Sequence, residues 1–187
     1  MSLSSLLIPS FTQMLKGLSK WLQTGATGAD ADADALLTRR LADDMYPLAS
    51  QVFFSCFMVQ DAIFRLRGQK VPDAVEGIRR KAWRAGEEPV AFADAIRQIE
   101  DTMSLLDSLA PDALDQGADR HLRIELPNGL LFELSGQEYA RDWALPQFYF
   151  HISMAYALLR HQGVELGKAD YLAHILTYIQ QAPAETA

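Results

Sequence analysis

The chain has 187 residues, and 17 Lys and Arg against 24 Asp and Glu give it a formal net charge of −7. This length fits one domain over residues 1–187. A composition of 49% hydrophobic and 22% charged residues is typical of a globular protein and excludes a disordered one. A pI near 5.0 without a basic block speaks against nucleic acid as a partner. The single cysteine, Cys56, excludes an internal disulfide and predicts a cytoplasmic location.

The sequence predicts no membrane span. Its first fifteen residues contain no Lys or Arg, so a secretory signal is not expected. Two uncharged stretches, at residues 45–60 and 143–159, are short for a membrane helix, and both contain polar side chains. We interpret them as buried helices, and no membrane partner is predicted.

Four long helices are predicted from apolar residues that recur every three or four positions. They cover residues 5–24, 47–67, 96–109 and 147–162, and a short exposed helix is predicted at 73–84. Glycine follows three of the long helices and favours a helix end at each of these points.

A β-hairpin is predicted at residues 120–134, where the apolar period changes from helical to alternating. Asn128-Gly129 between the two alternating runs is a strong hairpin signal. Ser135 and Glu138 then form the capping box of a short helix. Because a lone hairpin is only marginally stable, its apolar face is expected to lie on the helices.

Two further segments complete the predicted architecture. Residues 26–35, rich in Ala and Asp, are expected to form a flexible acidic loop, and residues 170–181 are expected to form an amphipathic C-terminal helix. The fold class is therefore mainly α, an up-down four-helix bundle with a short inserted β-hairpin and an extra C-terminal helix.

His151 is the main candidate functional residue, because it lies in an otherwise apolar stripe of its helix. A buried imidazole needs a polar partner, and Asp43, Asp44 and Gln51 on the facing helix are the nearest candidates. One hypothesis makes His151 a metal ligand or a general base that Asp44 assists. The alternative is a core histidine satisfied by a carboxylate or a backbone oxygen.

A neighbouring stripe of the same helix carries Tyr149, Tyr156 and Arg160. With Gln51, these side chains are candidates for the lining of a pocket that binds an anionic small molecule. The alternative is that the stripe packs against a neighbouring segment. Cys56 lies among aromatic residues, so its thiol is expected to have a raised pKa and to be unreactive.

Four segments resemble an uncharacterised domain-of-unknown-function family of the DinB/YfiT-like metalloenzyme superfamily. They are LADDMYPL (residues 41–48), RLRG (65–68), PQFYFH (146–151) and AYALLRHQGVELGKADY (155–171). The resemblance extends from the first helix to about Leu172, and it implies a DinB-like four-helix bundle that often forms a homodimer.

The resemblance also implies where a metal would bind. Metal-binding relatives hold a divalent ion with three histidines, one on the second helix and an i, i+4 pair on the last core helix. The matching positions here are Asp44, Gln147 and His151. Only one of the three is histidine, and this donor set suits zinc or nickel poorly. We expect no tightly bound cofactor and at most a weakly bound divalent metal.

Two functional hypotheses follow. The first is a homodimeric protein that binds a small molecule of unknown identity or serves a structural role, with a degenerate metal site. The second is a metal-dependent DinB-like enzyme of the thiol S-transferase or hydrolase type. The homodimer is predicted because the helices at 47–67 and 147–162 are apolar around most of their circumference, more than their own core requires. The alternative is that the hairpin and the C-terminal helix cover this surface.

Overall fold

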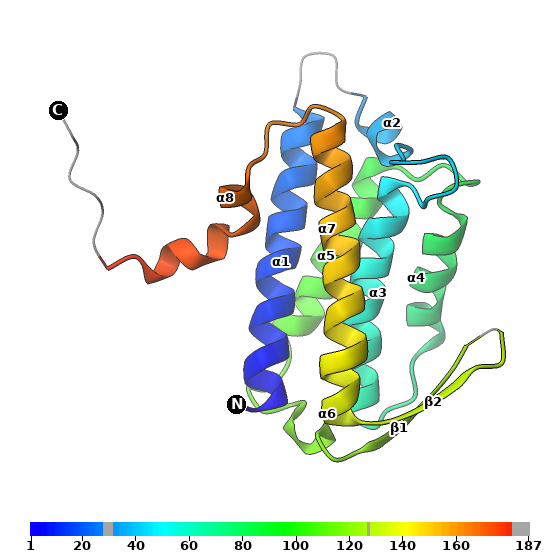
Figure 1. Cartoon of the computed structure of the whole chain (residues 1–187), viewed down its shortest axis with the longest axis vertical. Helices are drawn as coiled ribbons and strands as arrows, with labels where there is room; N and C mark the ends of the chain where they lie inside the picture. Colours follow the sequence, from blue (N-terminus) through cyan, green and yellow to red (C-terminus); the bar gives the residue numbers. More distant parts are fainter. Residues whose placement is uncertain (28–31, 127, 181–187) are drawn as a thin grey trace.

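The four predicted long helices form in the computed structural model of the chain, which describes residues 1–27, 32–126 and 128–180. Figure 1 shows them side by side along the length of the molecule. They are α1 (Leu3–Ala26), α3 (Leu48–Leu66), α5 (Phe92–Asp107) and α7 (Leu145–His161). The mainly helical bundle with an inserted two-stranded hairpin is therefore confirmed.

Shorter elements connect the long helices. The hairpin and the π-helix lie between α5 and α7, at the end of the bundle where the N-terminus is found (Figure 1). The elements are α2 (Ala33–Leu37), α4 (Asp73–Arg84), the 3-10 helix η1 (Asp115–Gly117), β1 (His121–Glu125), β2 (Leu131–Ser135), α6 (Gly136–Glu138), the π-helix η2 (Tyr139–Ala144), α8 (Lys168–Tyr171) and the 3-10 helix η3 (Ala173–Tyr178).

Helix α3 is the central helix of the fold. Every residue from Leu48 to Ile63 is buried, because α4, α5 and α7 pack around it. The apolar circumference of this helix predicted a dimer contact, and the polar composition of residues 73–84 predicted an exposed helix. In the structure α4 turns Val75, Ile78 and Ala82 toward the core and covers the outer face of α3.

The hairpin forms as an antiparallel pair in which Ile124 lies opposite Phe132. Its turn contains Gly129, whose φ of +83° is a conformation that glycine adopts without strain. Leu122 and Ile124 of β1 are buried, whereas Leu131 and Phe132 of β2 are exposed. Leu134 of β2 also packs against the core, and the ring of Phe132 lies 5.2 Å from that of Trp143. The apolar face of the hairpin therefore lies on the helices as predicted, although Phe132 stays 36% exposed.

The acidic loop is shorter than predicted. Helix α1 continues to Ala26, and Asp32 accepts a hydrogen bond from the Ala35 N–H as the N-cap of α2. Residues 28–31 of the predicted loop lie outside the described part of the chain. The flexible segment was thus assigned too many residues, because local composition did not reveal the cap at Asp32.

The C-terminal segment leaves the bundle after α7 and points away from it (Figure 1). It forms α8 and the 3-10 helix η3 instead of one continuous helix at 170–181. Tyr171 stacks on Trp21 of α1 with ring centroids 5.4 Å apart. Beyond this anchor, Ile175, Leu176 and Ile179 are exposed. Among the described helices, none is long and apolar enough to cross a membrane.

Candidate functional site

A cavity of about 240 Å³ lies between α3, α4 and α7, and the start of the hairpin turn and the π-helix also contribute to it. We call it the aromatic cavity, because four of the ten residues around it are Phe or Trp and a fifth is Tyr. It is lined by Tyr46, Phe54, Phe57, Met58, Arg79, Trp83, Leu126, Trp143, Gln147 and His151. Such a concave, mainly apolar site with a few polar groups is typical of small-molecule binding.

His151 lies at the wall of the aromatic cavity and is held from two sides. Its Nδ1 is 2.8 Å from Oε1 of Gln51, and its ring stacks on Phe54 with centroids 4.8 Å apart. The Gln51 Nε2 group donates to the Tyr46 carbonyl oxygen, so Oε1 is the acceptor and His151 Nδ1 carries the proton. The lone pair of the neutral ring is therefore on Nε2.

The pKa of His151 is lowered to about 4, because burial disfavours the charged form of the imidazole. The ring is neutral at pH 7, so Nε2 can accept a hydrogen bond and the imidazole is a weak base. This geometry favours a role in binding over general base catalysis, for which a pKa near the working pH is optimal.

This lowered pKa predicts a loss of stability in mild acid. The unfolded chain binds a proton near pH 6.5 and the folded chain only near pH 4, so the contribution of His151 is present above pH 6.5 and is lost as the pH falls. We expect urea unfolding to show a free energy about 2 kcal/mol lower at pH 5 than at pH 7. His151→Gln should remove most of this difference, and His161→Gln, at an exposed position, should not. Equal pH dependence in both variants would contradict the assignment.

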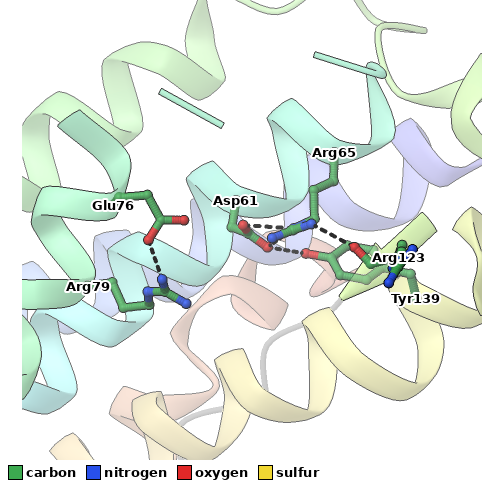
Figure 2. Close-up of polar contacts among 6 residues, drawn as sticks. All are labelled: Asp61, Arg65, Glu76, Arg79, Arg123 and Tyr139. Carbon is green, nitrogen blue, oxygen red and sulfur yellow. Dashed lines mark hydrogen bonds and ion pairs between the residues drawn. The ribbon is translucent and has the colours of Figure 1, made fainter. Parts of the chain in front are cut away.

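Arg79 is the cationic side chain in the lining of the aromatic cavity, and it is ion-paired with Glu76. Its guanidinium lies 4.8 Å from the Trp83 ring centroid and 5.5 Å from that of Phe57, and its Nη2 is 2.5 Å from a Glu76 carboxylate oxygen. Figure 2 shows this ion pair. Within the described residues, Nε of Arg79 is buried without a hydrogen-bond partner. A buried N–H that lacks an acceptor costs about 1–3 kcal/mol.

The structure brings two of the three predicted metal-site residues to the aromatic cavity, Gln147 and His151. The third, Asp44, is exposed in the turn before α3 and makes no hydrogen bond to His151. The side chain bonded to His151 is Gln51, because α3 begins only at Leu48 and Gln51 occupies the facing position.

The donors that are present do not fit a bound zinc or nickel ion. Nδ1 of His151 is hydrogen-bonded to Gln51, and Gln147 has a neutral amide. Asp44 is exposed and does not line the aromatic cavity. In the described ranges, no group of three or more His, Cys, Asp or Glu side chains is arranged to hold a metal ion. We therefore derive no step through a metal.

The other predicted pocket residues lie elsewhere. Tyr156 packs against Trp21 of α1 and Tyr171 of α8, with centroids 5.6 Å from each. Tyr149 packs on Phe148, and exposed Arg160 donates a hydrogen bond to the Val164 carbonyl oxygen. None of the three lines the aromatic cavity, and these contacts match the packing alternative.

Sequence reasoning missed the α4 side of the aromatic cavity. Arg79 and Trp83 are four residues apart and share a helix face, a spacing that the sequence displayed. They were overlooked because a polar helix with few apolar residues was interpreted as exposed. Cys56, in contrast, behaves as predicted: it is buried, and burial raises the pKa of its thiol to about 12.

A second polar cluster is buried at the other end of α3. Figure 2 shows the Asp61 carboxylate held by two side chains, Arg65 and Tyr139. The Arg65 Nε donates to both carboxylate oxygens at 2.8 and 2.7 Å, and the Tyr139 hydroxyl donates to Oδ2 at 2.8 Å. Burial and the nearby Asp61 charge raise the pKa of Tyr139 well above its usual value, so its hydroxyl stays protonated. The cluster joins α3 to the π-helix.

Comparisons with known proteins agree with this architecture. The model of a family described as "Domain of unknown function (DUF1993)" matches residues 3–172. The chain is also similar to the crystal structure of a DinB family member protein from Shewanella denitrificans, with 29% sequence identity and a TM-score of 0.71. That similarity covers 99% of this chain and 95% of the other. Among curated proteins, no match was found.

Proposed function

The chain belongs to the DUF1993 family and has a DinB-like fold, and from this premise we propose that it binds a small molecule in the aromatic cavity. The observation that carries the proposal is the buried Nε–H of Arg79, which has no hydrogen-bond partner among the described residues and lies beside a cavity lined by aromatic rings. A ligand oxygen is the acceptor that would satisfy this group.

The lining specifies the chemical class of the ligand. Phe54, Trp83 and Trp143 offer ring faces and edges to a planar apolar body. The Arg79 guanidinium favours an anionic group such as a carboxylate. The neutral His151 ring accepts a hydrogen bond at Nε2, and the Gln147 amide is both donor and acceptor. An aromatic carboxylate meets all of these requirements.

Titration with 2-naphthoate tests the proposal, since the fluorescence of Trp83 and Trp143 reports on the aromatic cavity directly. We expect saturable binding that Arg79→Gln weakens at least about tenfold, which is about 1.4 kcal/mol. Arg80→Gln is the matched control, because Arg80 is the exposed neighbour on the same helix. The neutral analogue 2-naphthalenemethanol should bind the wild type and Arg79→Gln equally.

Chelation separates this function from its alternative. On the binding hypothesis, dialysis against EDTA leaves 2-naphthoate affinity unchanged, because no protein-bound metal contributes to it. Loss of binding after chelation, or equal affinity in Arg79→Gln and the wild type, would instead favour a metal-dependent DinB-like enzyme of the S-transferase or hydrolase type.

A homodimer remains part of the proposal, on a basis different from the apolar surface of α3. Phe150 of α7 is 54% exposed, and the C-terminal segment exposes Ile175, Leu176 and Ile179. Monomeric proteins seldom leave large apolar patches in water, and a twofold contact is the commonest way to cover them. Substitutions at Phe54, which is buried within one subunit, would disturb the core and not the interface.

A further inference from the structure

A surface cleft of about 350 Å³ lies where α3 ends and β1 begins. We call it the basic cleft, because Arg65, Lys70, Arg120 and Arg123 line it and none of its described lining residues is acidic. The chain as a whole carries a net charge of −7, so a cluster of four cationic side chains differs from its average charge. Such a local field attracts anions.

The buried Asp61 cluster fixes one wall of the basic cleft. Figure 2 shows Arg65 between Asp61 and the strand residue Arg123. Besides the two bonds from Nε to Asp61, the Arg65 Nη1 donates to the Arg123 carbonyl oxygen at 3.4 Å. Within the described residues, Nη2 of Arg65 makes no hydrogen bond, which leaves it free for a ligand. A cation already held in place loses little side-chain entropy on binding.

Arg120 forms the opposite wall and is also held in place. Its Nε donates to the Leu66 carbonyl oxygen at 3.3 Å, at the end of α3. Its guanidinium packs over Gly68, whose φ is +67°, and occupies the space that a side chain at this position would need. The C-terminal end of α3, the negative end of the helix dipole, thus accepts one N–H of Arg120. Among the described residues, the two terminal nitrogens of Arg120 form no hydrogen bond.

Few acidic groups compete for these cations. Glu133 of β2 lies opposite Arg123 in the hairpin register, and its carboxylate is 3.9 Å from His121 Nε2. In the part of the chain that the structure describes, Lys70, Arg120 and Arg123 form no ion pair. Three full positive charges therefore face one small volume of solvent.

We propose that the basic cleft binds the phosphate group of a small phosphorylated molecule. Guanidinium groups donate two parallel N–H bonds to phosphate oxygens, and Lys70 adds a point charge. A phosphate dianion compensates more of the cluster's charge than a carboxylate, and its several oxygens can accept from both fixed arginines. The site is separate from the aromatic cavity, with which it shares no lining residue.

Calorimetric titration with pyrophosphate in 150 mM NaCl tests this inference. The double variant Lys70→Gln/Arg123→Gln should bind at least tenfold more weakly, and both positions are exposed, so folding should be preserved. Gly68→Ala should also weaken binding, since it displaces the Arg120 guanidinium. Arg97→Gln is the control, because this 68% exposed arginine lies on α5 outside the basic cleft.

Two results would overturn the proposal. One is an affinity for pyrophosphate that is the same in the double variant and in the wild type. The other is an equal loss in Arg97→Gln and the double variant, which would mean that net charge alone attracts the anion. Neither result depends on 2-naphthoate binding, so the two proposals fail independently.

Discussion

Replacing Asp61 by alanine is expected to lower the free energy of unfolding by about 3–5 kcal/mol, as measured by urea denaturation. The variant leaves the Arg65 charge without its partner and the Tyr139 hydroxyl buried without an acceptor. Losing this pair is more harmful than losing a surface ion pair, because the Arg65 side chain is only 24% exposed and its charge would stay largely desolvated without a partner.

Three further variants make this prediction specific. Asp61→Asn keeps an acceptor for Tyr139 and should lose less stability than the alanine variant. Tyr139→Phe should lose about 1–3 kcal/mol. Glu88→Ala removes the exposed Arg84–Glu88 pair, with side chains 66% and 65% exposed, and should change stability by less than about 1 kcal/mol. If Asp61→Ala changed the free energy of unfolding as little as Glu88→Ala, the Asp61 cluster would not be a stabilising element.

Gly136→Ala should be similarly damaging, with a loss of about 3 kcal/mol or more in thermal or urea unfolding. A Cβ atom at this position would collide with the backbone carbonyl oxygen of Gly117. That oxygen accepts the Arg120 N–H, and the next N–H after Gly136, from Gln137, bonds to the Ala118 carbonyl oxygen at 2.8 Å. The two backbones therefore cannot separate without breaking other hydrogen bonds.

Gly77→Ala is the matched control for Gly136→Ala. Gly77 lies in the middle of α4, and the nearest atom to a Cβ there is the Arg80 Nη2, at 3.7 Å. Because alanine is the better helix former, this variant should gain about 0.5–1 kcal/mol. Stability changes of opposite sign in the two variants would confirm that the close approach of another backbone, and not the loss of a glycine, determines the effect. A neutral Gly136→Ala variant would refute it.

Most of the helical architecture could be predicted because its signals are local. Apolar spacing identified the four long helices, and the Ser135 and Glu138 capping box forms as predicted, with the Ser135 hydroxyl accepting the Glu138 N–H. What covers each helix is not a local property. An apolar circumference on α3 indicates burial, but it does not say whether α4 or a second subunit provides the cover.

The candidate site could be predicted only in part for the same reason. Desolvation correctly required a polar partner for His151, yet Gln51 and Asp44 were equally acceptable by residue type. The choice depended on where α3 begins, and helix starts are the least certain feature of a sequence pattern. The spacing of Arg79 and Trp83 placed them on one helix face, but the sequence did not show that this face meets Phe57 of α3.

The hydrogen bond between Gln51 and His151 also has a kinetic consequence. Helices α3 and α4 are joined by a short connection and can meet early, whereas Gln51 and His151 are 100 positions apart in sequence. We therefore expect the aromatic cavity to be completed late in folding, when α7 docks on a hairpin of α3 and α4. A ligand that contacts both α7 and the pair of α3 and α4 stabilises contacts that form late in folding. It should therefore slow unfolding while leaving the refolding rate nearly unchanged.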